Sequence, residues 1–578
     1  MPSCPKLGLN ILLDPSVISG FKKTIAREEV EDNSASRLSH VGYAAYEALK
    51  FKHGFFHHSL WNVTSGRVVG ELDHTPKDAW TREEGDPVEG HDDWFPEKLG
   101  EIISRTEIWC DVLSLGPPDG AFMDEFNKAL ITVAERAKSQ EKIITVRMMF
   151  GNIPAMPVNC KKVIKKLTWG IPNDDSTFLR LWVGAWRKNV SWNHAKIIAV
   201  DGHMLHTGGH NLWDRHYLKD SPVHDLSFEL EGRITNDAHR FANEQWSFIR
   251  RKQHTLVGYF VDKIPDNWLV AMQTRVTVSE FPKGIASEFA PSFNLELIPF
   301  RERLEDSIPM ISVGRYGSLT WKLRPADDAM LAMLNSSTTI IRMALQDLGP
   351  CIVPDVLGTG TKIPLPGLEW PKPYMDALGR AIWERGVDVE IVLSHPNSIP
   401  DGLGPTEANY GNGWTCEDVA SYIINRIRKK FPDSESDGLR KKVEGNLRVC
   451  YLKQKIGREY SNGIKMGMHA KHFIVDDICT YIGSQNLYVC DLAEWGVIVD
   501  NADQTRKFMD EYWNPIWASS FTGEDCNVEE VMNGLDIDRD GDTGGAFEKL
   551  DPSRRMSSML NSGNKPTDTE LFGEDTDE

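Results

Sequence analysis

Two stretches of the chain carry the same reactive side chains at the same spacing. The first begins at His194 and reads HAKIIAVD, and the second begins at His469 and reads HAKHFIVD. In both, a Gly-Gly or Gly-Ser pair and an Asn-Leu pair follow at matching offsets. These downstream residues are Gly208, Gly209, Asn211, Gly483, Ser484 and Asn486. Because the two copies share so many positions, they form an internal repeat rather than a coincidence.

Within each repeat, strand geometry separates the reactive residues from the acidic one. Each run is short, apolar and rich in β-branched residues and ends in a turn signal, which predicts a β-hairpin. Side chains alternate between the two faces of a strand, so His194 shares a face with Lys196, and His469 with Lys471. The Asp that closes each motif points away or sits in the turn, which favours a structural role, as turn former or local charge partner, over a direct chemical one. The two residues are Asp201 and Asp476.

A His beside a Lys predicts anion binding rather than metal binding. An ammonium group has no acceptor lone pair and repels a cation, which makes the pair a poor zinc site. The Lys can neutralise phosphoryl oxygens, the Asn amide can donate a hydrogen bond, and the Gly pairs can let backbone N–H groups approach the anion. Two such half-sites facing each other would hold one phosphodiester between two imidazoles, one attacking phosphorus and the other protonating the leaving oxygen.

The paired HxKxxxxD motifs, with GGxN and GSxN at matching offsets, resemble the phospholipase D superfamily over roughly residues 100–520. The resemblance implies a reaction through a covalent phosphohistidine that requires no metal. It also implies that His194 is the nucleophile and His469 the general acid, an order that the residues alone leave open. In motif layout the chain is similar to the secreted bacterial phospholipases D, while the superfamily also includes nucleases and phosphatidyltransferases such as cardiolipin synthases.

Each imidazole also needs an acidic partner that orients it. Downstream of each Asn an acidic residue opens an apolar run, Asp225 in the first half and Glu494 in the second, and the family has an acidic residue in a comparable position. We expect these two carboxylates to orient the histidines, with an exposed carboxylate at a strand start as the alternative. His210, in the first GGxN segment, either donates a hydrogen bond to the head group or faces solvent in a turn.

The composition is that of a soluble, acidic globular protein. The chain has 578 residues, with 65 Lys and Arg against 84 Asp and Glu and a formal charge of -19, which disfavours nucleic acid as a partner. Nine cysteines without CxxC spacing predict reduced thiols. The N-terminal apolar stretch is too short and polar for a secretory signal, and no later run reaches about 18 apolar residues. We therefore expect a cytoplasmic protein whose contact with membranes is peripheral.

The predicted elements recur in the same order in the two halves. The first half has a strand over 107–113, a helix over 120–138, strands over 143–150 and 178–183, the first reactive hairpin and a helix over 236–251. The second half has a strand over 338–345, a helix over 373–385, a strand over 387–393, a helix over 416–431, a strand over 447–452, the second reactive hairpin and a helix over 502–517. Units of the β-α-β kind place neighbouring strands parallel.

We therefore predict an α/β fold of two repeated halves, each a mixed β-sheet flanked by helices, packed about a pseudo-two-fold axis with the active site at their interface. The predicted divisions are an N-terminal leader that packs on the core (1–98), the first half (99–285), the second half (286–521) and an acidic, disordered tail (522–578). Two segments rich in Gly and Pro, 349–371 and 402–414, either meet acyl chains at the mouth of the site or are ordinary packed loops.

One segment of the tail begins like a calcium-binding loop. Asp536, Asp538 and Asp540 copy the opening of an EF-hand, but position 12 is Phe547, where a bidentate Glu belongs. The segment is therefore either a weak calcium site or an acidic turn. We expect the reaction itself to require no cofactor.

The leading function is cleavage of the head-group phosphodiester of a glycerophospholipid, or transfer of the phosphatidyl group when an alcohol replaces water. Phospholipid is then the main partner. A nuclease or other phosphodiesterase is the first alternative. A nuclease would need a basic cluster to bind nucleic acid, and the candidates are Lys161, Lys162, Lys165 and Lys166. The alternative is that these lysines form a solvated helix face. A non-catalytic lipid-binding protein is the second alternative, and the complete His and Lys set in both motifs argues against it.

Overall fold

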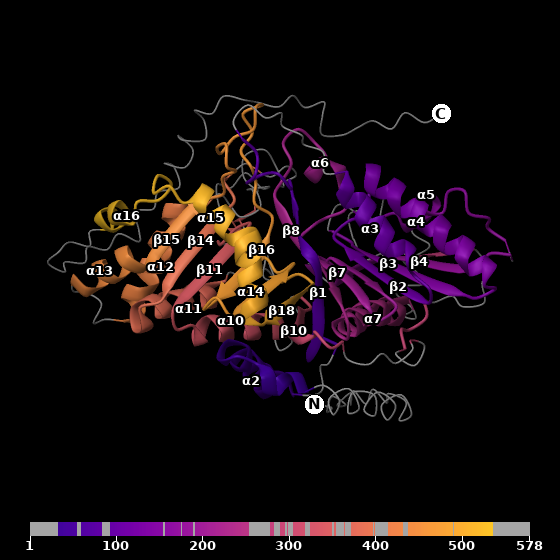
Figure 1. Cartoon of the computed structure of the whole chain (residues 1–578), viewed down its shortest axis with the longest axis horizontal. Coiled ribbons are helices and arrows are strands. Elements are labelled where there is room, and N and C mark those ends of the chain that lie inside the picture. Colours follow the sequence, from indigo (N-terminus) through magenta and orange to yellow (C-terminus); the bar gives the residue numbers. More distant parts are fainter. Residues whose placement is uncertain are drawn as a thin grey trace, which may run out of the picture.

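The computed structural model describes residues 33–535, except for 55–58, 84–92, 154–156, 175, 189–190, 254–277, 283–289, 295–297, 299–303, 318–323, 350–351, 354–362, 365–370, 397, 399–413, 432–436 and 489–490. One mixed β-sheet of 16 strands runs across the molecule and is flanked by helices (Figure 1). Strands of the first half of the chain lie toward one end of this sheet and strands of the second half toward the other. The predicted α/β class is confirmed.

Three parallel and three antiparallel strands form the centre of the first half. The parallel strands are β2 (Trp109–Ser114), β3 (Ile144–Gly151) and β4 (Leu179–Lys188), and the antiparallel ones are β6 (Ile197–Val200), β7 (Met204–Gly208) and β8 (Asp225–Glu231). Alternation along β6 sends Ile198 and Val200 into a core with the helices α3 (Trp94–Ser104), α4 (Gly120–Ser139) and α5 (Cys160–Leu167). Ile197 and Ala199 instead join the core beneath α7 (Ile234–Gln253).

The second half has the same plan. Its parallel strands are β11 (Ile340–Leu345), β14 (Asp388–Leu393) and β15 (Leu447–Tyr451), and its antiparallel strands are β16 (Lys471–Val475), β17 (Cys479–Gly483) and β18 (Glu494–Asp500). One face is covered by α10 (Pro325–Ser336), α11 (Lys372–Arg380), α12 (Cys416–Lys430) and α13 (Asp437–Asn446). The predicted helix over 502–517 is three consecutive segments, α14 (Ala502–Phe508), the π-helical turn η6 (Met509–Trp513) and α15 (Asn514–Ser520). A second π-helical turn, η4 (Ala381–Arg385), extends α11.

Two strands that we did not predict join the halves. β1 (Trp61–Thr75) pairs antiparallel with β8 on one side and with β10 (Ile308–Arg315) on the other, and β10 pairs with β18. The leader therefore supplies a central strand of the sheet. Its pattern is irregular because Gly66 and Gly70 interrupt it and the register shifts between Val69 and Asp73.

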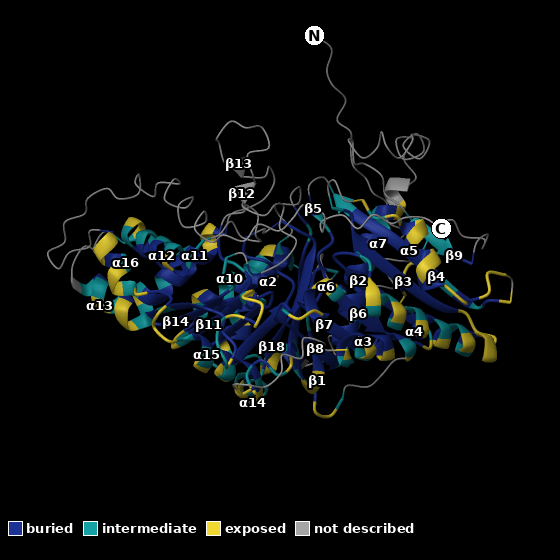
Figure 2. Cartoon of the chain, turned by 90° about the horizontal axis from the view of Figure 1, so that it is seen from above, coloured by how far each residue is buried: buried dark blue, intermediate teal, exposed yellow. Residues whose placement is uncertain are grey.

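The strand order mirrors itself about the β1–β10 pair. From β15 at one end, and from β4 near the other, it passes through three parallel strands and then three antiparallel ones before it reaches that pair. This order agrees with the expected pseudo-two-fold relation, which stays a prediction. The strands are buried along most of their length, whereas the outer faces of the helices are exposed (Figure 2).

The remaining elements are short or peripheral. They are η1 (Asn33–Arg37), α2 (His40–His53), β5 (Ser191–Trp192), α6 (Asp214–Tyr217), β9 (Val278–Phe281), β12 (Ile352–Val353), β13 (Ile363–Pro364) and α16 (Val528–Gly534). Most of the segments 349–371 and 402–414 and all of the tail after residue 535, including the proposed calcium-binding aspartates, lie outside the described residues. The cysteines that the structure describes are buried and free.

Candidate active site

Both reactive hairpins have the same local architecture. His194 and His469 precede β6 and β16, and the turn after each strand holds an Asp with positive φ, 50° at Asp201 and 55° at Asp476. Each carboxylate accepts hydrogen bonds from three consecutive backbone N–H groups, those leading into β2 for Asp201 and those leading into β11 for Asp476. Burial would raise the pKa of Asp476, but these bonds outweigh it and lower the pKa to about 2. Both aspartates are therefore placed to tie the hairpin to its neighbouring strand.

The two predicted orienting carboxylates reach across the interface between the halves. His469 Nδ1 lies 2.5 Å from Asp225 Oδ2, and His194 Nδ1 lies 2.8 Å from Glu494 Oε1. The backbone makes the same exchange. The His194 N–H donates to the Ala493 carbonyl, next to Glu494, and the His469 N–H donates to the His224 carbonyl, next to Asp225, both at 2.7 Å. Each imidazole is therefore held by the opposite half, and the site exists only where the halves meet.

The surroundings of these two carboxylates differ. Asp225 accepts a hydrogen bond from the Tyr217 hydroxyl at 2.8 Å, whereas Glu494 forms an ion pair with the buried guanidinium of Arg315. Burial would raise the pKa of Glu494, but Arg315 and His194 outweigh it and lower the pKa. One imidazole thus faces a carboxylate that is paired with a cation, and the other faces a carboxylate held by a neutral hydroxyl.

Both motif lysines are buried beside their own histidines. Lys196 Nζ donates to the carbonyl of His194 at 2.9 Å, and Lys471 Nζ donates to the carbonyl of His469 and, at 3.2 Å, to Gln346 Oε1. The four motif residues are only 1% to 5% exposed. Burial lowers the pKa of Lys471 to about 8, although two nearby carboxylates raise it. After burial, the ammonium of Lys471 is the main cause that lowers the pKa of Lys196, so both cations lie in one centre.

Burial and the two cations also keep both imidazoles neutral near neutral pH. Burial and Lys196 lower the pKa of His194 to about 4, against the opposing effect of Glu494. Burial, Lys471 and Lys196 hold the pKa of His469 well below its usual range. Because the lysine of each half acts on the histidine of the other, the four residues form a single site. Its reactive side chains include two lysines, whose ammonium forms attract an anion.

The two predicted asparagines have buried amide atoms without partners. Among the described residues, nothing hydrogen-bonds to Oδ1 or Nδ2 of Asn211 or to Oδ1 of Asn486. Their backbone N–H groups are used, since Asn211 donates to the Tyr217 hydroxyl and Asn486 to Glu494. Unpaired buried polar atoms cost free energy. Of the three atoms only Nδ2 of Asn211 is a donor, so it is the candidate contact for a bound anion.

The Gly pairs serve the sheet, which corrects the expectation that their N–H groups approach the anion. Gly209 N–H donates to the Leu226 carbonyl at 2.8 Å, and Ser484 N–H donates to the Trp495 carbonyl at 3.1 Å. A Cβ on Gly209 would lie 2.0 Å from Asp225 Oδ1. The absence of side chains thus allows the orienting carboxylate and the neighbouring strand to approach closely. Gly208 and Gly483 are equally crowded, with a Cβ at 2.4 Å from Ser227 Cα and 2.7 Å from Gly496 Cα respectively.

His210 has neither of its expected roles. Its Nε2 lies 3.0 Å from Thr75 Oγ1 and its Nδ1 lies 2.7 Å from Ser227 Oγ, so both ring nitrogens are used within the protein. The side chain is buried, and burial lowers its pKa to about 3. His210 therefore links β1 to β8 and neither reaches a head group nor faces solvent.

Three residues that contact the motif side chains or their carboxylates were not identified from the sequence. They are Tyr217, Arg315 and Gln346. None belongs to a motif or repeats at a matching offset in the other half. Only their contacts with Asp225, Glu494 and Lys471 reveal them.

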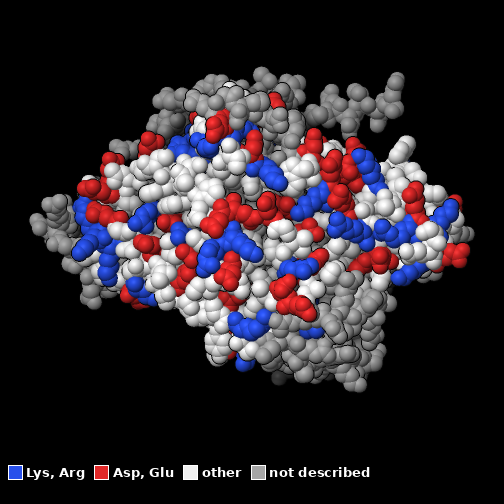
Figure 3. Space-filling view, viewed as in Figure 1, with Lys and Arg blue, Asp and Glu red and all other residues white. Residues whose placement is uncertain are grey.

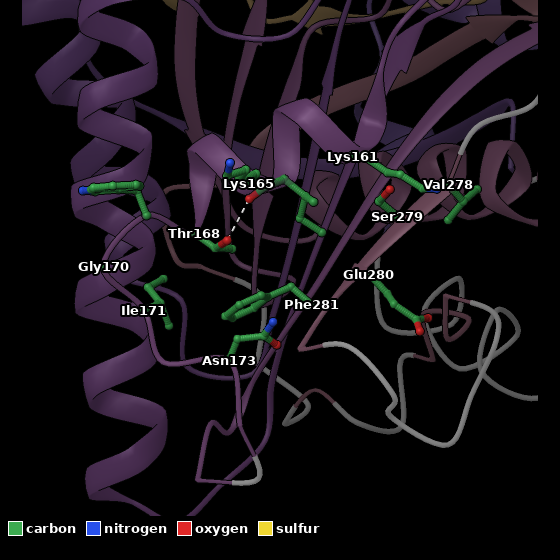
Figure 4. A pocket seen from close by; sticks show the side chains of 12 residues that line it. Lys161, Lys165, Thr168, Gly170, Ile171, Asn173, Val278, Ser279, Glu280 and Phe281 are labelled. Carbon is green, nitrogen blue, oxygen red and sulfur yellow. Dashed lines mark hydrogen bonds between the residues drawn. The ribbon is translucent and has the colours of Figure 1, made fainter. Parts of the chain in front are cut away.

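The lysine cluster of the nuclease alternative lies apart from this centre. Its four lysines are exposed on α5, and Lys161 and Lys165 line a hollow of about 780 Å³ between α5 and β9 (Figure 4). The described residues that line the hollow include none of the reactive ones. On the molecular face in Figure 3, basic and acidic side chains are interspersed rather than gathered into a basic strip. Within the described ranges, no group of three or more His, Cys, Asp or Glu side chains could hold a metal ion.

No family model matches the chain, but comparison with known proteins gave several similar proteins. A phospholipase D from Streptomyces antibioticus is 23% identical over 458 residues, which cover 73% of this chain and 76% of that protein. The solved phosphatidylserine synthase of Haemophilus influenzae Rd KW20 is 11% identical, with 82% of this chain and 91% of that chain covered and a TM-score of 0.43. Nuc from Salmonella typhimurium, a phospholipase D family member, is 18% identical, with 36% and 96% covered and a TM-score of 0.20.

The repeated motifs, the centre in which they meet and the phospholipase D relative define the class of the protein. The chain belongs to the phospholipase D superfamily. It is an enzyme of the phosphodiesterase type. In the part of the chain that the structure describes, we find no helix with the length and apolar character needed to cross a membrane.

Proposed function

We propose that the protein cleaves the head-group phosphodiester of glycerophospholipids to phosphatidic acid and transfers the phosphatidyl group when an alcohol replaces water. The proposal rests on two buried imidazoles, each held at Nδ1 by a carboxylate of the other half, in one centre with two ammonium groups. The phospholipase D relative supports a phospholipid substrate. The acidic balance of the chain disfavours a nucleic acid.

In the first step, His194 Nε2 attacks phosphorus. The P–N bond forms as the P–O bond to the head group breaks, and His469 Nε2 gives its proton to the departing alcohol oxygen. Contact of the carboxylates with Nδ1 leaves Nε2 as the reacting nitrogen in both rings. The motif resemblance assigns the attack to His194 and the proton transfer to His469.

In the second step, water or another alcohol resolves the phosphohistidine. His469 takes the proton of the attacking hydroxyl, a new P–O bond forms and the P–N bond to His194 breaks, which restores both imidazoles. Water gives phosphatidic acid, and an alcohol gives a new phosphodiester. One site therefore accounts for hydrolysis and for transfer.

Charge complementarity supports both steps. A phosphodiester anion would offset the two ammonium charges, so the pKa of His469 should rise when substrate binds and the ring could then carry the proton that it donates. Lys196, Lys471 and the side-chain N–H groups of Asn211, whose Nδ2 is unpaired, and of Asn486 would contact the non-bridging oxygens. A preorganised set of donors stabilises the negative charge on these oxygens in the transition state.

The test uses phosphatidylcholine vesicles with ethanol as a second acceptor and EDTA present throughout. Wild-type protein should form phosphatidic acid and phosphatidylethanol, and His194→Ala should form neither. Phosphatidylethanol is informative because it requires an intermediate that an alcohol can intercept. If the wild type forms neither product from phosphatidylcholine or other phospholipids but cleaves single-stranded DNA, the lipid assignment is wrong.

Removing either motif lysine should slow turnover strongly. Lys196→Ala and Lys471→Ala should each cost about 2–4 kcal/mol of transition-state stabilisation, by analogy with the loss of one oxyanion donor, which corresponds to roughly 30- to 1,000-fold in kcat. The measurement is steady-state hydrolysis of a soluble phosphodiester. Lys161→Ala, on the exposed face of α5, is the control and should keep wild-type rates. Equal rates for all three variants would remove the lysines from the mechanism.

The pH profile of kcat/KM should fall on both sides of neutrality. Lys471, with a pKa of about 8, is charged below that pH and loses its charge above it, so activity should decline as pH rises through about 8. His194, with a pKa of about 4, should lose its nucleophilic lone pair below that pH. Lys471→Arg keeps its charge at high pH and should move the alkaline limb upward. An unchanged alkaline limb in this variant would exclude Lys471 as its cause.

A further inference from the structure

Gln346 lies inside the reactive centre, although no motif includes it. It follows β11 directly and is 2% exposed. Its backbone N–H donates to the carbonyl of Ala470, the residue between His469 and Lys471. Its side-chain Oε1 accepts from Lys471 Nζ at 3.2 Å, and its Nε2 has no partner among the described residues. A buried carboxamide thus has one end on the ammonium and the other end unpaired.

The first half has no such group. In the sheet, Ala344 pairs with His472 and Leu113 pairs with Ile197, and His472 and Ile197 hold the same place in the repeat. Two residues further along, Gln346 in the second half therefore corresponds to Leu115 in the first. The side chain of Leu115 is apolar and can accept no hydrogen bond from an ammonium group. The two half-sites, alike in their His, Lys and Asn residues, differ at this position.

The chemistry of the unpaired group limits what it can bind. An amide Nε2 donates hydrogen bonds, so its partner must be an acceptor. The adjacent Lys471 ammonium repels cations and attracts anions. A phosphoryl oxygen satisfies both groups, because it can accept from the amide and from the ammonium at once. The carboxamide also restricts the ammonium, since Oε1 occupies one of its three N–H donors and the His469 carbonyl occupies another.

We propose that Gln346 is a further phosphate-binding residue, which donates from Nε2 to a non-bridging phosphoryl oxygen and positions Lys471 through Oε1. This inference deepens the proposed function and rests on it for the identity of the substrate. It makes the two half-sites unequal, because the phosphoryl group meets two lysines and two asparagines but only one glutamine. The second half thus holds the phosphate with one more donor than the first.

The test compares three variants. Gln346→Met removes the amide at similar size, and Gln346→Glu keeps an acceptor for Lys471 but loses the donor. Leu115→Met makes a mild change at the corresponding position of the other half and is the matched control. Inorganic phosphate is the probe, titrated by calorimetry into each protein, and kcat and KM are measured on bis(4-nitrophenyl) phosphate. Thermal unfolding by circular dichroism checks that each variant is folded.

Gln346→Met should weaken phosphate binding and lower kcat/KM by about 10- to 100-fold, the range expected for a hydrogen bond to a charged group. Gln346→Glu should weaken phosphate binding at least as much. It should also move the alkaline limb of kcat/KM upward, because a carboxylate beside Lys471 stabilises the ammonium. Leu115→Met should stay within about twofold of wild type. The shift in Gln346→Glu tests only the contact with Lys471, whereas the phosphate affinity of the uncharged Gln346→Met tests the donor role.

Phosphate affinity within about twofold of wild type in a folded Gln346→Met or Gln346→Glu protein would overturn the proposal. If Gln346→Met does not fold, Gln346→Glu carries the same test. The phosphate titration needs no turnover, so it also separates this inference from the proposed function. If the wild-type protein binds phosphate through Gln346 but cleaves no phospholipid, the proposed lipid substrate is wrong, and the proposed phosphate contact still holds.

Discussion

His194→Ala should form no phosphoenzyme, whereas His469→Ala should accumulate one. Only His194 is assigned to form the P–N bond, so its loss removes the intermediate itself. Without His469, attack still proceeds on a substrate whose leaving group needs little acid assistance, such as a 4-nitrophenyl ester, but no base activates the water that resolves the intermediate. Loss of turnover should be on the order of 10⁴-fold or more in both variants, as for members of other catalytic triads.

The measurement is intact-protein mass spectrometry after rapid mixing with a 4-nitrophenyl phosphodiester, which detects the added phosphoryl mass. Burst release of 4-nitrophenolate from His469→Ala, at one equivalent per site, is the kinetic counterpart. Lys161→Ala is a suitable control, because this exposed lysine of α5 lines a hollow that includes none of the reactive residues. A phosphoenzyme in His194→Ala and none in His469→Ala would reverse the two roles while leaving the chemistry intact.

The crossed carboxylates predict the second large effect. Asp225 contacts His469 and Glu494 contacts His194, so each substitution should impair the histidine of the other half. Asp225→Asn should slow turnover on the order of 10³- to 10⁴-fold with an alkyl head group, the scale seen when an orienting Asp is replaced by Asn. The loss should shrink with a 4-nitrophenyl leaving group in burst experiments, because phosphoenzyme formation then needs little acid.

Glu494→Gln should slow phosphoenzyme formation by a similar factor with both leaving groups, since it disturbs the attacking imidazole. This dependence on the leaving group separates the two carboxylates. Asp201→Asn is the comparison for Asp225→Asn, and it should lower stability by about 1–3 kcal/mol through its weakened backbone hydrogen bonds while changing kcat less. If Asp201→Asn slowed turnover more than Asp225→Asn, the assignment of the orienting residue would fail.

Local sequence patterns predicted elements whose signals are contained within a few residues. The helix expected over 416–431 is α12 (Cys416–Lys430), which begins at a capping box between Thr415 and Asp418. The two hairpins follow from short β-branched runs that end in Asp turns. β1 was missed because its regularity is broken by Gly66, Gly70 and a register shift. Its place between β8 and β10 depends on partners that are far away in the chain.

The sequence by itself determined which residues are candidates for the chemistry of this protein. Residue types and spacings, present twice, identified two His-Lys pairs, two asparagines and two acidic residues, because a reactive group and its immediate strand neighbours are encoded side by side. Only the tertiary structure decided which carboxylate serves which histidine. That contact joins His469 to Asp225, 244 positions away, and such a pairing depends on how the two halves pack. For the same reason Arg315 and Gln346 became visible only in the folded chain, where packing brings them to Glu494 and Lys471.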